Sequence, residues 1–147
     1  MSYLSIFEIS SSGMTVERAR LDVSAVNLAN VNSTRAANGS TFKPLRVMSG
    51  PKTGDTFSAA LDAFGAANSA PGVQVNEIRQ LDVAPRLVYE PAHPDADAKG
   101  FVSYPGINPV GEMVNLISTM RAYEANVVAM NAAKSMALKA LEIGGNG

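Results

Sequence analysis

Residues 109–143 carry the pattern that most restricts how this chain can fold. Large apolar residues recur there every seven positions in two rows, and Asn108 followed by Pro109 is typical of a helix start. Gly144 and Gly145 predict where the helix ends. A repeat of seven predicts that this long helix packs against another helix, as in a coiled coil. The two rows contain Met113, Met120, Val127 and Leu141, and Leu116, Tyr123, Met130 and Ala137.

The same segment is more apolar than a single helical partner requires. Of its 35 residues 21 are apolar, whereas a helix that buries one face needs about three positions in seven. This surplus favours burial against other subunits, because the chain is too small to cover such a helix itself. The alternative is that seven alanines, which tolerate solvent, inflate the count. The large apolar residues outside the two rows include Ile117, Val128, Leu138 and Ile143.

A second long helix is predicted from residue 3 to about residue 32. Residues 10–13, three serines and a glycine, are poor helix formers, so the sequence leaves open whether the helix breaks there. The two terminal helices, together about 60 residues, are predicted to pair as an antiparallel coiled coil. The row of apolar residues seven apart in this helix contains Phe7, Met14, Leu21 and Leu28.

The middle of the chain predicts a small antiparallel β lobe with long loops and no large core. All prolines except Pro109 lie in it, and short β-type runs at residues 42–48, 73–81, 86–89 and 101–104 are separated by turn residues. Residues 53–68, rich in Gly, Ala and Ser, fit a loop or a short helix. The fold class is therefore α+β, in three segments: residues 1–34 (helix), 35–107 (β lobe) and 108–147 (helix).

Composition argues against several classes of function. The chain has 147 residues and a net charge of −1, so it has no excess of basic residues to hold nucleic acid through its phosphates. It has no cysteine and a single histidine, His93, which argues against structural zinc, disulfides and thiol- or histidine-based catalysis. The longest apolar run, residues 127–130, is far shorter than the ~20 residues of a membrane span.

The N-terminus does not resemble a secretory signal peptide. No Lys or Arg precedes Arg18, and Glu8 stands where such a peptide carries positive charge. We therefore expect the chain either to remain in the cytosol or to leave it by a route that reads another kind of signal.

One loop begins like a calcium site. Asp95 and Asp97 are spaced as in a calcium-binding loop, but Lys99 stands where an oxygen ligand is required. Gly106 stands where that loop needs a bidentate Glu. No other group of residues has the spacing of a phosphate loop, a nucleophile motif or a metal site. The sequence therefore predicts no catalytic residues, no cofactor, no metal and no small-molecule substrate.

Five strings of residues point to a family. Residues 28–34 (LANVNST) close the first helix, residues 87–102 (LVYEPAHPDADAKGFV) lie in the middle, and residues 110–115, 121–126 and 134–139 lie in the last helix. Together they resemble the axial proteins of the bacterial flagellar rod and hook, and within them the proximal rod proteins of the FlgC type. The residues that match the family motifs are Asn30, Tyr89, Glu90, Pro91, Gly111 and Glu112.

The resemblance implies a structural, non-enzymatic subunit of the flagellar basal body. Such subunits polymerise helically into a shaft that crosses the periplasm and transmits torque, with the terminal helices lining an inner tube. The implied partners are other copies, other proximal rod proteins, the adjoining distal rod protein, and rotor-ring and export-gate proteins. The implied route is the flagellar type III apparatus, which removes no signal peptide. The alternatives are another axial rod protein, or a cytosolic helical adaptor or export chaperone.

Overall fold

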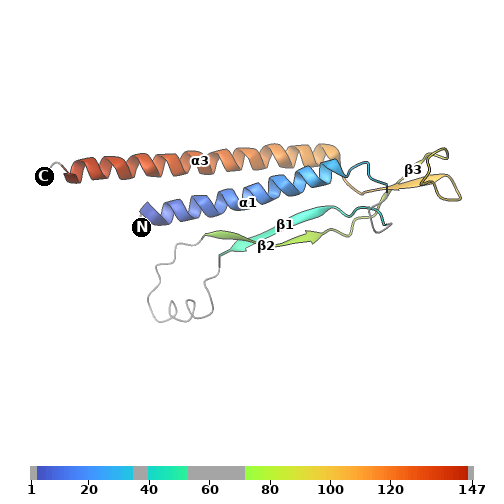
Figure 1. Cartoon of the computed structure of the whole chain (residues 1–147), viewed down its shortest axis with the longest axis horizontal. Coiled ribbons are helices and arrows are strands. Elements are labelled where there is room, and N and C mark those ends of the chain that lie inside the picture. Colours follow the sequence, from blue (N-terminus) through green and yellow to red (C-terminus); the bar gives the residue numbers. More distant parts are fainter. Residues whose placement is uncertain (1–2, 35–39, 53–71, 146–147) are drawn as a thin grey trace, which may run out of the picture. The chain divides into compact units, whose positions relative to one another are not determined.

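The structure, a computed structural model, describes residues 3–34, 40–52 and 72–145. In chain order it contains helix α1 (Tyr3–Ala29), strands β1 (Leu45–Pro51), β2 (Val73–Gln80), β3 (Arg86–Tyr89) and β4 (Phe101–Tyr104), and helix α3 (Pro109–Gly145) (Figure 1). Two long terminal helices packed together, with small antiparallel hairpins between them in the sequence, confirm the predicted α+β class. Residues 53–68, predicted as a loop or short helix, lie outside the described residues.

The helix boundaries follow from local hydrogen bonds. At the start of α3, the Asn108 side-chain oxygen accepts hydrogen bonds from the backbone N–H groups of Val110 and Gly111, at 3.1 and 3.2 Å, which confirms the predicted cap. Helix α1 ends slightly earlier than predicted, and the Asn30 side chain adds hydrogen bonds at its end. It donates to the Val26 carbonyl oxygen and accepts from the Ser33 hydroxyl group.

Helix α1 is continuous through residues 10–13, where the sequence left a break open. The hydroxyl groups of Ser12 and Thr15 donate to the carbonyl oxygens of Ile9 and Ser11, three and four residues earlier, without interrupting the helix. Gly13 does not bend α1 but allows it to pack closely on α3, because a Cβ placed on Gly13 would lie 3.1 Å from the Asn126 side-chain amide of α3.

The strands form two separate two-stranded sheets, β1–β2 and β3–β4, where the sequence suggested a single small lobe. Strands β3 and β4 pair antiparallel, with Arg86 opposite Tyr104 and Tyr89 opposite Phe101. Strand β1 begins three residues later than predicted. Its predicted start includes Pro44, which lacks the N–H group that a paired strand donates.

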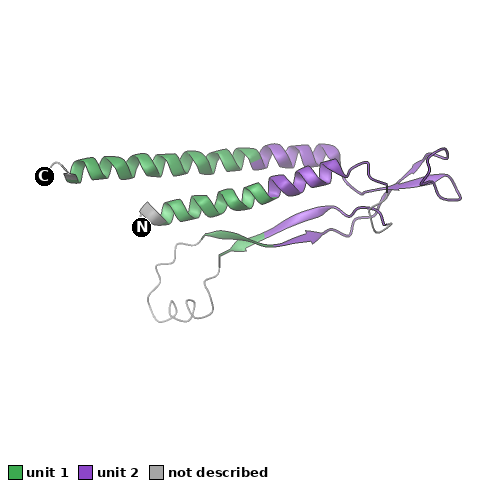
Figure 2. Ribbon diagram, in the orientation of Figure 1, with its two compact units in different colours: residues 1–19, 49–76, 120–147 green, residues 20–48, 77–119 purple. Residues whose placement is uncertain are grey.

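The chain divides into two compact units, each of which joins distant parts of the sequence (Figure 2). Unit 1 comprises Met1–Ala19, Ser49–Asn76 and Met120–Gly147, and unit 2 comprises Arg20–Met48 and Glu77–Thr119. In unit 1, α1 contacts α3 at Gly13 and the β2 strand at Ser12, whose hydroxyl oxygen accepts the Val73 N–H at 3.1 Å. In unit 2, α1 reaches β1 through the side chain of Asn27.

The apolar core within the described residues is small. The buried hydrophobic side chains are Val16, Val23, Val102 and Ala133, and as many polar side chains are buried. Buried polar groups contribute little net stability even when they are hydrogen-bonded. Within the described residues, the chain itself fully encloses few of its apolar side chains. The buried polar residues are Ser10, Ser24, Asn27 and Thr119.

We expect the substitution Gly13→Leu to weaken the contact between α1 and α3 in unit 1. A side chain at residue 13 must displace Asn126, because even a Cβ would lie 3.1 Å from its amide. Overpacking of this kind costs about 1–3 kcal/mol, more than the ~1 kcal/mol that a helix gains when Gly is replaced. Thermal unfolding followed by circular dichroism measures the change.

The matched control is Gly144→Leu near the end of α3, where an added Cβ meets no atom within 4 Å. We expect this variant to unfold at or above the temperature of the unmodified chain. If Gly13→Leu is as stable as Gly144→Leu, the close approach at Gly13 does not hold the two helices together.

Candidate functional site

Helix α3 exposes most of its large apolar side chains. They repeat along the whole helix and reach 72% exposure at Leu141 and 81% at Ile143. Single exposed apolar residues are ordinary, but this number of them on one helix marks an interaction surface. We define the outer face of α3 as its large apolar side chains that are at least 46% exposed: Val110, Met113, Val114, Ile117, Met120, Val128, Met136, Leu138, Leu141 and Ile143.

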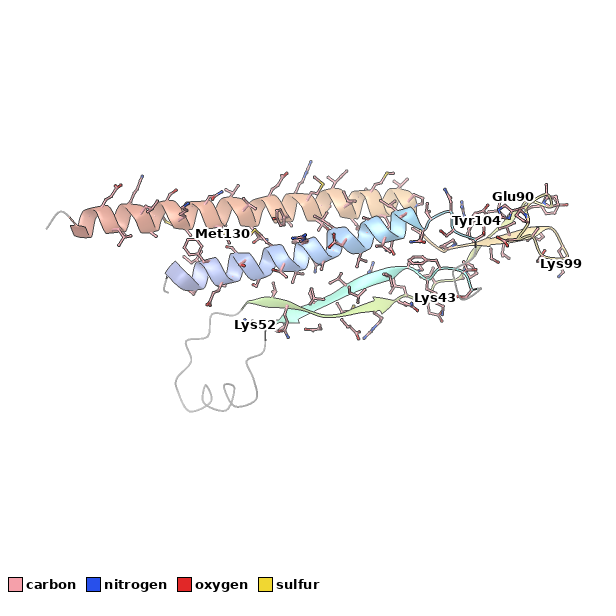
Figure 3. The ribbon with its side chains drawn as sticks, in the orientation of Figure 1. Lys43, Lys52, Glu90, Lys99, Tyr104 and Met130 are labelled. Atoms are coloured by element: carbon pink, nitrogen blue, oxygen red, sulfur yellow. The ribbon has the colours of Figure 1, made fainter. Side chains whose placement is uncertain are left out.

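The two predicted heptad rows of α3 lie in different surroundings. The first row begins at Met113, which is exposed. Its Met120 and Leu141 are exposed as well, and its Val127 is half-buried. In the other row, Leu116, Met130 and Ala137 are half-buried and Tyr123 is 36% exposed. Figure 3 shows Met130 between α3 and α1.

The side of α3 that packs inside the chain is centred on small residues. Thr119 and Ala133 are its buried positions. In α1, the predicted row of Phe7, Met14, Leu21 and Leu28 is half-buried throughout. The buried positions of α1 lie beside that row, and most of them are small or polar: Ser10, Val16, Val23, Ser24 and Asn27.

Asn27 joins the end of α1 to the start of β1. Its side-chain amide donates to the Leu45 carbonyl oxygen at 2.9 Å, and its side-chain oxygen accepts the Leu45 N–H at 2.8 Å. The side chain thus pairs with the Leu45 backbone as a neighbouring strand would. Asn27 is 1% exposed, so these hydrogen bonds have no competition from water.

The motif that follows α1 is held by side-chain hydrogen bonds. Asn30, one of the predicted motif residues, closes the helix through its bonds with Val26 and Ser33. The Thr34 hydroxyl group donates to the Asp95 carboxylate at 2.7 Å, across 61 residues of sequence. This segment therefore connects the end of α1 to the turn between β3 and β4 in unit 2.

The central motif residues Tyr89, Glu90 and Pro91 lie at the end of β3 and in the following turn. The Tyr89 ring contacts the Phe101 ring edge-on, with 5.3 Å between ring centres. The Tyr104 hydroxyl group donates to the Glu90 carboxylate at 3.1 Å (Figure 3). Two causes raise the pKa of Tyr104 above its usual value. The first is desolvation of its hydroxyl group, and the second is the hydrogen bond of that group to the Glu90 carboxylate.

The turn between β3 and β4 requires glycine at position 100. Gly100 has a φ of 82°, in the left-handed region that side chains disfavour. A Cβ there would also lie 2.9 Å from the Tyr89 ring and 3.2 Å from Pro91. Within the central motif, Tyr89, Glu90 and Gly100 therefore each have a structural role in a compact turn.

The acidic residues of this turn hold its backbone. The Asp97 carboxylate accepts the N–H groups of Lys99 and Phe101, and the Asp95 carboxylate accepts the Thr34 hydroxyl. Within the described residues, no group of three His, Asp or Glu side chains could hold a metal ion. Elsewhere in unit 2, on the surface, the Lys43 ammonium group hydrogen-bonds to the Asp82 carboxylate at 2.8 Å and lowers the pKa of that carboxyl.

The other motif residues, Gly111 and Glu112, lie in the first turn of α3. The N–H group of Gly111 is capped by Asn108, and the Glu112 carboxylate is favoured there by the helix dipole. Glu112 also lines an open groove of about 370 Å³ in unit 2, with Arg20 and Arg46 on its walls. The lining of the groove mixes polar, charged and apolar side chains.

In the parts of the chain that the structure describes, no helix has both the length and the apolar character needed to cross a bilayer. The outer face of α3, which consists of apolar side chains, has the chemistry of a protein-binding surface.

Comparison with known proteins agrees with this reading. Residues 98–143 match the family described as the C-terminal region of the flagellar basal body rod FlgEFG proteins. The flagellar basal-body rod protein FlgC of Bacillus subtilis (strain 168) is 46% identical over 142 residues, covering 92% of this chain and 94% of its own length. The FlgC protein of Escherichia coli O6:H1 is 41% identical over 144 residues, covering 98% and 99%. That of Borreliella burgdorferi is 36% identical over 149 residues, covering 97% and 98%.

These matches, together with the paired terminal helices, define a rod protein of the bacterial flagellar basal body. Within that class, the chain belongs to the FlgC family. It is a structural subunit of the rod and not an enzyme, as the resemblance implied. Family membership decides against a cytosolic adaptor or export chaperone.

The sequence analysis did not single out Asn27, although its position inside a predicted helix indicates that its side chain has a specific partner. It stands inside a predicted helix, where an asparagine side chain is unfavourable unless it has a specific partner. That partner, the backbone of Leu45, lies 18 residues away in a strand and is not visible from helical periodicity.

We expect Asn27→Ala to destabilise unit 2. The substitution leaves the Leu45 N–H and carbonyl groups without their partner in a buried site, at a cost of about 1–3 kcal/mol for each unsatisfied group. Urea unfolding measures the loss. Asn32→Ala, at an exposed position in the following turn, is the control and should change the free energy of unfolding by less than about 0.5 kcal/mol. Equal stability of the two variants would contradict the role given to Asn27.

Proposed function

We propose that this subunit polymerises helically, with copies of itself and with other proximal rod proteins, into the proximal part of the rod. The observation that carries the proposal is the outer face of α3, which the subunit leaves in water. Burial of apolar surface contributes about 25 cal/mol per Å², so covering a face of this length supplies the association energy that a polymer needs. The few apolar side chains buried inside the described chain agree with this assignment.

In this proposal residues 1–34 and 108–147 form the inner tube, and residues 35–107 lie outside it. The shaft crosses the periplasm and transmits torque, and the tube inside it is part of the export channel. Its neighbours are the distal rod protein at one end and rotor-ring and export-gate proteins at the other. The long helices support this arrangement, because paired helices resist bending and torsion better than loops or small sheets do.

Export through the flagellar type III apparatus, without a cleaved signal peptide, is the route that fits the chain. A subunit that passes through a narrow channel must unfold, and a small apolar core lowers the free energy that unfolding requires. The chain also has no cysteine that could oxidise after leaving the cytosol.

We expect Met120→Asp to abolish swimming while export continues. Met120 is 46% exposed in the subunit, so the variant should fold and be exported. In the rod the new carboxylate would be buried in an apolar contact, at a cost of several kcal/mol in every copy. Swimming in soft agar and an immunoblot of the periplasmic fraction measure the two properties.

The control is Arg121→Ala, the neighbouring exposed position, which lies outside both heptad rows. It should reduce swimming much less than Met120→Asp does. Full motility of Met120→Asp would mean that this part of the outer face stays in water in the rod, and would contradict the proposed assembly.

A further inference from the structure

From Arg121 onward, one side of helix α3 is polar. Its polar residues follow one another at intervals of three, four or seven positions, which places them on a single line along the helix. All of them are exposed in the subunit. Val128, 67% exposed, is the one large apolar side chain on this line within the described helix. We call the polar residues of the line the polar stripe: Arg121, Glu124, Asn131, Ser135, Lys139 and Glu142.

The polar stripe lies on the side of α3 that points away from α1. Within unit 1, Asn126 lies against Gly13 of α1, and Ala133 is fully buried, so these two positions of α3 mark its packed side. Glu124 stands two residues before Asn126, and Ser135 stands two residues after Ala133. At about 3.6 residues per turn, two residues are roughly half a turn around the helix.

Apolar side chains border the polar stripe on both sides. Within this part of α3, the first flank also carries Lys134, whose ammonium group can reach water while its stem packs. In cross-section, the C-terminal part of α3 therefore has four sides, namely the packed side, two apolar flanks and the polar stripe. The first flank contains Met120, Val127 and Leu138, and the second contains Ala125, Ala129, Ala132, Met136 and Ile143.

We propose that the polar stripe faces the bore, the water-filled channel inside the tube, while the two flanks pack on neighbouring subunits. The inference rests on the proposed function, because it assumes that α3 lies in the wall of a tube. A helix in such a wall has a neighbour on each side, and apolar flanks gain free energy when these neighbours cover them. The polar stripe is the exposed side that loses least by remaining in water.

The order of the elements in unit 1 decides which way the polar stripe faces. Helix α1 contacts β2, where the Ser12 hydroxyl oxygen accepts the Val73 N–H, and it contacts α3 at Gly13. Figure 2 draws α1 between β2 and α3 in this unit. The proposed function places the β segment outside the tube, so α1 is the middle layer and α3 the innermost one. A stripe that points away from α1 then points into the bore.

The charges of the polar stripe are balanced. Arg121 and Glu124 carry opposite charges three positions apart, and so do Lys139 and Glu142. A bore lined by a single sign of charge would attract chains of the other sign and repel chains of its own sign. A balanced polar surface favours neither, which suits a bore that unfolded polypeptides of any net charge pass through.

Labelling of single cysteines by maleimide tests the proposal, because the chain has no cysteine of its own. Ser135→Cys is a nearly isosteric change in the polar stripe, and Ala129→Cys is the matched change on the second flank, six residues earlier. Both positions are exposed in the subunit. Each full-length variant is labelled as the isolated chain and in purified basal bodies. One reagent is a small maleimide, and the other is a maleimide attached to a polymer too large to enter the bore.

We expect the two variants to react at similar rates as isolated chains. In basal bodies, Ser135→Cys should react with the small maleimide at least tenfold faster than Ala129→Cys, and the polymer reagent should modify neither. Asn131→Cys and Ala125→Cys repeat the comparison at a second pair of positions, also six residues apart, and should give the same result.

Four results would overturn the proposal. Protection of Ser135→Cys from the small maleimide in basal bodies would mean that the polar stripe is buried between subunits. Its modification by the polymer reagent would place the stripe on the outside of the rod. Equal labelling of Ala129→Cys and Ser135→Cys would leave the second flank in water. The absence of Ser135→Cys from basal bodies that contain the unmodified tagged chain would contradict a position in water. If the tagged chain without cysteine is itself missing from basal bodies by immunoblot, the proposed function fails instead.

Discussion

The apolar surface of α3 that the chain cannot cover is the constraint on which the rest of this structure depends. A helix of 37 residues is paired with one of 27, and its outer face carries methionine, leucine, isoleucine and valine in contact with water. In an isolated globular domain such a face would promote aggregation. In a subunit of the flagellar rod we propose that this face is the means of assembly, which would make the fold one part of a larger packed structure.

Polar contacts, more than apolar ones, determine the geometry inside each unit. Asn27 fixes β1 against α1, Asn30 closes α1, and Thr34 joins the following segment to Asp95. In unit 1, Ser12 and Gly13 give α1 its contacts with β2 and with α3. Such contacts specify one arrangement while adding little net stability. This combination suits a chain that we propose is exported unfolded and becomes stable in the rod.

Much of the fold could be predicted from the sequence because its strongest signals are local. The Asn108 and Pro109 pair predicted the start of α3, and short β-type runs between turn residues predicted β3 and β4 at the positions observed. The continuity of α1 through Gly13 could not be predicted, since three serines and a glycine are poor helix formers and the packing of Gly13 near Asn126 joins distant parts of the sequence. Nor could the heptad pattern show which row of α3 faces α1, because a helix that is apolar on several sides gives no unique direction. The separation into two small sheets depends on long-range pairing that turn signals do not contain.

Methionine oxidation offers the most direct test that the outer face of α3 is buried in the rod. Met113 and Met136 are 55% and 51% exposed in the subunit, and Met120 is nearly as exposed. Their oxidation by peroxide can be followed by mass spectrometry in the isolated chain and in purified basal bodies. The account predicts that all three oxidise readily in the isolated chain and at least tenfold more slowly in basal bodies. Equal rates in the two samples would contradict it, because the outer face would then remain in water after assembly.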